Sequence, residues 1–145
     1  MTEDTPCPVI VAKKDDEAYK MVSFELVDPN GAELPAFSAG SHIDVRIPGG
    51  LVRQYSLCNS SSERNRYVMG VWNDANSHGG SKALHEKAQV GATLQVGLPR
   101  DRFRAPRSTK QAILMAHGIG VTPILSIADY LKSQDIPFTF DYVFA

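Results

Sequence analysis

Residues 42–47 alternate strictly between polar and apolar side chains, and this pattern constrains the fold more than any other in the 145-residue chain. A period of two is typical of a β-strand that buries one face and exposes the other. Pro48, Gly49 and Gly50 come next and favour a tight turn. We therefore expect residues 51–57 to return as the antiparallel partner of this strand.

Four more short segments have the composition of strands: residues 8–14, 19–27, 66–72 and 93–96. The turn residues Asp28-Pro29-Asn30-Gly31 follow the second of them. We interpret the mixed charges of residues 13–17 as an exposed hairpin loop. Short strands separated by turns predict a small antiparallel barrel or sandwich.

The pattern changes after residue 105. Residues 111–116 include an apolar run, which predicts a strand buried on both faces. A tight turn over residues 117–123 and a helix over residues 124–132 are expected next, with Thr122 as the helix N-cap and Pro123 as its first residue.

A further strand is predicted over residues 138–144, which completes a β-α-β unit, the building block of a parallel sheet. The sequence thus predicts two domains. Residues 1–105 form a mainly β domain, and residues 106–145 form the beginning of an incomplete α/β domain.

Composition excludes several classes of function. The net charge of −1 gives no field that would attract nucleic acid or a membrane surface. The longest apolar runs are too short to span a bilayer, and no secretory signal follows Met1. We therefore expect a cytoplasmic protein with no nucleic-acid or membrane partner.

The chain has two cysteines, Cys7 and Cys58. A plant-type [2Fe–2S] cluster requires four cysteine ligands, so this chain cannot hold one. We recognise no residues in the sequence with the spacing of metal ligands, so we expect no bound metal.

Arg53, Tyr55 and Ser56 are the first candidate binding residues. Alternation along a strand places Arg53 and Tyr55 on one face and Gln54 and Ser56 on the other. A guanidinium binds phosphate through paired hydrogen bonds, and an aromatic side chain covers a flat ring. The set suits a ligand that has both groups, although an ordinary half-exposed strand would have the same spacing.

Gly79-Gly80-Ser81 is the second candidate. It precedes a helix predicted over residues 82–87, with Ser81 as N-cap. The unpaired N–H groups of a helix start bind anions, and glycine lets a phosphate approach the backbone closely. A capped helix after a flexible loop is the alternative.

Gly118 and Gly120 open the third candidate, between the predicted strand and helix of the β-α-β unit. They match the beginning of the dinucleotide-binding fingerprint, but Thr122 and Pro123 stand in place of its third glycine. A close strand-to-helix turn without a ligand is the alternative.

Taken in order, these motifs resemble one family. They are the run Arg53-Gln54-Tyr55-Ser56-Leu57-Cys58-Asn59, the loop Gly79-Gly80-Ser81, the segment Leu98-Pro99-Arg100-Asp101-Arg102-Phe103 and the turn Gly118-Ile119-Gly120-Val121-Thr122-Pro123-Ile124-Leu125. The chain resembles the reductases of Rieske-type oxygenase systems, in particular the phthalate dioxygenase reductase and vanillate O-demethylase reductase group of the ferredoxin–NADP reductase superfamily.

The resemblance implies a six-stranded antiparallel Greek-key barrel that binds FMN, followed by an NAD(P)H-binding α/β domain and a plant-type ferredoxin domain. It further implies that electrons pass from NAD(P)H through FMN to an iron–sulfur centre and then to a Rieske-type oxygenase or O-demethylase. The oxygenase and a ferredoxin domain outside this chain are therefore the expected partners.

The resemblance also assigns roles. Arg53, Gly80 and Ser81 would hold the FMN phosphate, and Ser56 would lie near flavin N5 as the catalytic candidate. Tyr55 and Leu57 would line the ring. The full set expected to bind cofactors is Arg53, Gln54, Tyr55, Ser56, Leu57, Val71, Trp72, Gly79, Gly80, Ser81, Gly118, Gly120, Thr122 and Pro123.

Two features depart from the family pattern. His117 stands where a small residue is expected, and it would either crowd the dinucleotide or point away. The chain also ends after only one β-α-β unit, so we expect a truncated form without the ferredoxin domain. Two other interpretations remain: a non-catalytic flavin-binding fragment without hydride input, and an FAD enzyme of the wider superfamily.

Overall fold

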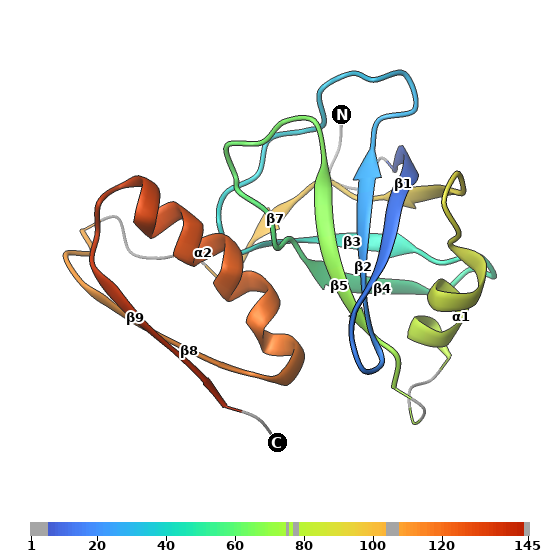
Figure 1. The fold of residues 1–145 in the computed structure, drawn as a ribbon. Helices are drawn as coiled ribbons and strands as arrows, with labels where there is room; N and C mark the ends of the chain where they lie inside the picture. The colour runs from blue at the N-terminus through green and yellow to red at the C-terminus, as the bar shows by residue number, and fades with distance from the viewer. Residues whose placement is uncertain (1–5, 75, 77–78, 104–107, 144–145) are drawn as a thin grey trace.

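A computed structural model describes residues 6–74, 76, 79–103 and 108–143. Six strands form an antiparallel sheet in the order β4-β3-β6-β1-β2-β5, and the short strand β7 pairs with β3 (Figure 1). The strands are β1 (Cys7–Ala18), β2 (Met21–Val27), β3 (Ser41–Arg46), β4 (Val52–Ser56), β5 (Tyr67–Trp72), β6 (Thr93–Val96) and β7 (Arg100–Asp101).

The sheet closes into a barrel where the chain leaves β4. Leu57 forms an antiparallel bridge with Met69 of β5, and the N–H of Cys58 donates a 2.8 Å hydrogen bond to the carbonyl of Val68. The predicted pairing of residues 42–47 with residues 51–57 is confirmed, since β3 and β4 are antiparallel neighbours. The expected six-stranded antiparallel barrel is therefore present.

The barrel interior follows from the alternation along each strand. In β2, Val22, Phe24 and Leu26 point inward and are buried, and the residues between them are half-buried. Ile43 and Val45 of β3 are also fully buried. Burial of each such side chain contributes about 1.5–3 kcal/mol, so the alternation fixes which face of every strand forms the core.

The predicted hairpin loop at residues 13–17 is wrong. These residues lie within β1, where Lys13 pairs with Glu25 and Lys14 pairs with Phe24. The turn comes later, and Lys20 has a positive φ of 59°. The pairing with β2 satisfies the backbone, while the charged side chains of residues 13–17 are exposed or half-buried, so charge alone did not indicate a loop.

The second part of the chain is a β-α-β unit. β8 (Ala112–His117) leads through the 3-10 helix η1 (Gly118–Gly120) into α2 (Val121–Ser133), and β9 (Phe138–Val143) follows. β8 and β9 are parallel, as predicted. The predicted boundary at residues 105 and 106 lies outside the described residues.

α2 covers one face of this two-stranded sheet. Ile124, Ile127 and Leu131 pack against Leu114 and Ala116. The opposite face is open: Ile113 and Met115 are 70% and 68% exposed, respectively. The prediction that residues 111–116 are buried on both faces is therefore wrong for this chain, because α2 covers only one side.

Two predicted helix caps are also wrong. α1 (Gly80–Lys87) has Gly79 at its N-cap position, so Ser81 lies inside the helix. α2 has Gly120 at its N-cap position, and the hydroxyl of Thr122 instead donates to the carbonyl of Ile119 at 3.0 Å. In both cases the helix begins earlier than the sequence suggested.

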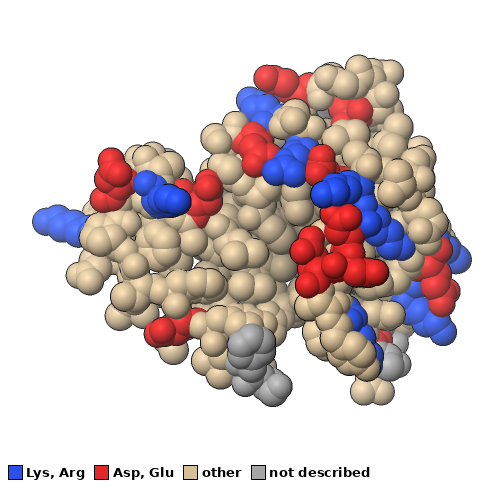
Figure 2. All heavy atoms as spheres, in the orientation of Figure 1, with Lys and Arg blue, Asp and Glu red and all other residues tan. Residues whose placement is uncertain are grey.

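The surface carries both signs of charge. Lys and Arg side chains are interspersed with Asp and Glu over the face in Figure 2, and the surface over β8 and β9 is largely uncharged. Within the described residues, neither helix has the length and apolar character needed to cross a bilayer.

Candidate functional site

Arg53 and Gly80 lie against each other, although they are distant in sequence. A Cβ atom placed on Gly80 would stand 3.0 Å from both Cγ and Nε of Arg53. Gly80 is buried and Arg53 is half-buried. The first two candidate motifs therefore form one site, and the absence of a side chain at Gly80 allows the close approach.

The start of α1 completes this region. Gly79 adopts a left-handed conformation with φ of 88°, and among the described residues no side chain caps the first turn. Its early N–H groups and the positive end of the helix dipole lie beside the Arg53 guanidinium. This combination of charge and N–H donors suits a phosphate group.

Tyr55 lies next to Arg53 on the same face of β4, as the alternation predicted. Arg53 pairs with Val45 and Tyr55 pairs with Ile43, and both partners point into the barrel. Burial raises the pKa of the Tyr55 hydroxyl, and the Arg53 charge opposes this effect. The phenol therefore remains protonated and able to donate a hydrogen bond at neutral pH.

Gln54 and Ser56 point to the other face of β4, opposite Asp44 and His42. Gln54 is exposed, whereas Ser56 is half-buried. Leu57 is fully buried. β4 is the terminal strand of the sheet order and pairs along its length only with β3 among the described strands, so its other edge can offer backbone groups to a ligand.

Val71 and Trp72 lie on opposite faces of β5. Val71 is buried in the barrel, whereas Trp72 is 41% exposed. Trp72 lines a cavity of about 600 Å³ together with His117 and Gly118. The structure thus brings Trp72 to the third candidate motif, and His117 lies at the surface of the same cavity.

The turn that contains Gly118 and Gly120 packs beside β5. Gly118 has a positive φ of 53°, and a Cβ atom on either glycine would meet open space. Thr122 is buried, and its Cγ2 lies 3.0 Å from the position of a Cβ atom on Gly70. Thr122 therefore holds the turn against the barrel, and Pro123 follows in the first turn of α2.

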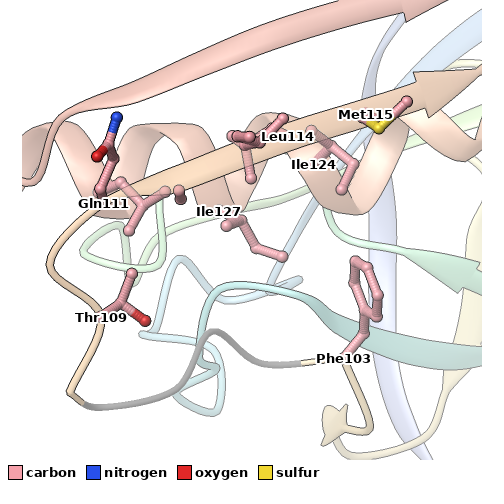
Figure 3. Close-up of a pocket in the computed structure, with 10 residues that line it drawn as sticks. Phe103, Thr109, Gln111, Leu114, Met115, Ile124 and Ile127 are labelled. Carbon is pink, nitrogen blue, oxygen red and sulfur yellow. The ribbon is translucent and has the colours of Figure 1, made fainter.

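Another cavity lies apart from all these residues. It has a volume of about 490 Å³ and lies beside β8 and α2, lined by apolar side chains that include Phe103, Leu114, Ile124 and Ile127 (Figure 3). None of the site residues predicted from the sequence lines it. We therefore assign no part of the candidate site to this cavity.

Sequence reasoning missed two residues that hold α1 in place. The imidazole Nε2 of His85 lies 3.2 Å from the carbonyl oxygen of Val71, and Lys14 Nζ donates to the carbonyl of His85. Lys14 and His85 are far apart in sequence and belong to no motif, so only the folded arrangement identifies them.

Comparison with known proteins gives a consistent result. No family model matches the chain. It is 50% identical over 134 residues to the vanillate O-demethylase oxidoreductase of Acinetobacter baylyi, which covers 92% of this chain and 42% of the relative. It is 45% identical over 126 residues to the phthalate dioxygenase reductase of Burkholderia cepacia, covering 87% and 39% of the two proteins.

The solved structure of a phthalate dioxygenase reductase superposes with a TM-score of 0.95 at 43% identity. The match covers 98% of this chain and 44% of that one, which is described as a modular structure for electron transfer from pyridine nucleotides to [2Fe–2S]. This chain spans about two fifths of the length of the curated relatives it matches.

The barrel and the β-α-β unit have the fold of the ferredoxin–NADP reductase superfamily. Within that superfamily, the chain is a domain of the phthalate dioxygenase reductase and vanillate O-demethylase reductase type.

Proposed function

We propose that this chain binds FMN and acts as the flavin part of an oxygenase reductase. The observation that carries the proposal is the contact between Arg53 and Gly80 at the start of α1. It places a guanidinium and helix N–H groups together, which suits the terminal phosphate of FMN. We call Arg53, Gly80 and Ser81 the phosphate corner.

The flavin ring would lie along the open edge of β4, beyond the phosphate corner. Tyr55 is half-buried next to Arg53 and offers an aromatic ring and a hydroxyl group. Leu57 and Val71 support the two strands from inside the barrel. In this arrangement the Ser56 hydroxyl would donate a hydrogen bond to flavin N5, which is the role we propose for it as the catalytic residue.

The proposed electron donor is NAD(P)H, which would approach the turn formed by Gly118, Gly120, Thr122 and Pro123. Open space beside both glycines allows close approach to the backbone. A bound flavin would accept two electrons from the nicotinamide as a hydride and release them one at a time. We propose that the acceptor is an iron–sulfur centre outside this chain, which in turn serves a Rieske-type oxygenase.

The relatives support this path. The similar phthalate dioxygenase reductase is described as transferring electrons from pyridine nucleotides to [2Fe–2S], and other relatives are reductase subunits of oxygenase systems. By itself the chain covers only about two fifths of such proteins. A flavin-binding module without hydride input is the second candidate function.

The experiment is a binding titration of the purified chain with FMN, FAD and riboflavin, followed by addition of NADH or NADPH without oxygen. We expect FMN to bind most tightly, because riboflavin lacks the phosphate and FAD carries a bulkier group. Tightest binding of FAD would favour the wider superfamily. Bleaching of bound flavin by either nucleotide would support hydride input, and its absence would support the binding module.

A further inference from the structure

His85 connects α1 to β5. Its Nε2 lies 3.2 Å from the carbonyl oxygen of Val71, and its half-buried ring stands edge-on to Phe24, with centroids 6.3 Å apart and an interplanar angle of 89°. A neutral imidazole with its proton on Nε2 donates to this carbonyl. Burial and the charge of Lys14 lower the pKa of His85, whereas the Val71 contact and Asp16 oppose the shift.

Lys14 connects the same turn of α1 to β1. Its ammonium group donates to the carbonyl of His85 and lies 5.4 Å from the centroid of Phe24. Its Nζ is also 3.4 Å from Oε1 of Gln89, beyond the end of the helix. The last turn of α1 is therefore attached to two barrel strands.

The first turn of the same helix contacts β4, through Gly80 and Arg53. α1 thus connects β4 and β5, which are the two ends of the sheet order. Because α1 is a rigid helix of eight residues, the contact of His85 with Val71 also sets the position of Gly80 and Ser81.

We propose that His85 is a positioning residue for the phosphate corner. By donating to Val71 it holds α1 so that the N–H groups at Gly80 and Ser81 face the phosphate bound by Arg53. The inference rests on the proposed FMN function, and His85 itself touches no flavin. Its contribution is therefore selective for the phosphate of the ligand.

The test compares FMN with riboflavin, which has the same ring and ribityl chain but no phosphate. In His85→Ala we expect FMN affinity to fall about three- to tenfold, the range of one hydrogen bond, and riboflavin affinity to change less than about twofold. His85→Gln keeps an N–H donor on a side chain of similar reach, so we expect FMN affinity within about twofold of the parent chain.

Glu86→Ala is the matched control, since Glu86 is on the same helix and exposed, and its carboxylate lies 4.0 Å from Lys82 Nζ. Lys14→Met removes the ammonium group that donates to the carbonyl of His85, and it should show the same selective loss of FMN affinity. If His85→Ala does not fold, the comparison of Lys14→Met with the parent chain decides.

Several outcomes would overturn the inference: an equal loss for both ligands, unchanged FMN affinity in a folded His85→Ala protein, or His85→Gln behaving as His85→Ala. If the parent chain binds neither FMN nor riboflavin, the proposed function itself fails and the inference falls with it. Binding of FMN by the parent chain separates these two kinds of failure.

Discussion

The hydroxyl of Ser126 in α2 donates a buried hydrogen bond of 2.8 Å to the backbone carbonyl of Asn59. Asn59 lies between β4 and β5, where its side chain accepts from the N–H of Val68 at 3.0 Å and donates to the carbonyl of Arg66 at 3.1 Å. The β-α-β unit is therefore attached to the loop that joins the two strands of the proposed flavin site.

Ser126→Ala should lower the free energy of unfolding by about 1–3 kcal/mol, because it leaves the buried carbonyl of Asn59 without this donor. Urea denaturation of the parent and variant chains measures the change. Ser133→Ala is the control, since that hydroxyl is exposed and donates to the backbone carbonyl of Tyr130 within its own helix. Equal losses of stability in the two variants would show that the hydrogen bond to Asn59 contributes no more than the exposed hydrogen bond of Ser133.

Arg53→Ala should weaken FMN binding by about 1.5–3 kcal/mol, the range for a hydrogen bond to a charged group. Riboflavin binding should change much less, since riboflavin has no phosphate. Fluorescence titration of both ligands checks this expectation. Arg46→Ala removes an exposed guanidinium from the neighbouring strand β3 and serves as the charge-matched control. Unchanged FMN affinity in Arg53→Ala would show that Arg53 does not bind the phosphate.

Much of the barrel could be predicted from the sequence because its strands follow a simple alternation. Residues 42–47 and 51–57 were predicted as partners, and β3 and β4 are partners in the structure. The helix starts could not be predicted to the residue. Ser81 and Thr122 have good N-cap side chains, but glycines at positions 79 and 120 occupy those places instead.

The candidate site could also be predicted only in part from the sequence. The sequence identified Arg53 and Gly80 as separate motifs, and the fold brings them into contact. It also grouped Val71 with Trp72, although adjacent residues on a strand face opposite ways and only Trp72 lines the cavity beside Gly118. Contacts such as that of His85 with Val71 depend on packing between distant segments, which no local pattern encodes.

Gly40→Ala should destabilise the chain by about 3 kcal/mol or more. Gly40 has a φ of 93°, and a Cβ atom there would lie only 1.8 Å from the carbonyl oxygen of Phe103. The substitution therefore combines backbone strain with displacement of the segment after β7. Thermal and urea denaturation measure the loss.

Gly31→Ala is the matched comparison for Gly40. Gly31 also has a positive φ, of 74°, but a Cβ atom there would meet open space. We expect it to cost only about 1–2 kcal/mol, the cost of the left-handed conformation alone. A similar loss of stability in both variants would mean that a small shift of the backbone at Phe103 makes room for the Cβ atom at position 40.

Stability should fall as the pH decreases below about 6.5, because two histidines are held in their neutral forms. Burial lowers the pKa of His42, with Arg100 adding to the shift, and burial and Lys14 lower the pKa of His85. The unfolded chain therefore binds more protons than the folded chain between the folded pKa values and the ordinary value of 6.5. Their contribution to stability is complete above that value and is lost below it.

Urea denaturation at about pH 7.5 and pH 5.5 measures this dependence, which spans the ordinary histidine pKa. The double variant His42→Gln/His85→Gln should show a flatter profile, since glutamine does not titrate. The lowered pKa of Glu63, which is paired with Arg66, acts in a separate range below its ordinary value of 4.5. If the double variant loses as much stability between these two pH values as the parent chain, other groups cause the pH dependence. His42 and His85 would then have the same pKa in the folded and unfolded chains.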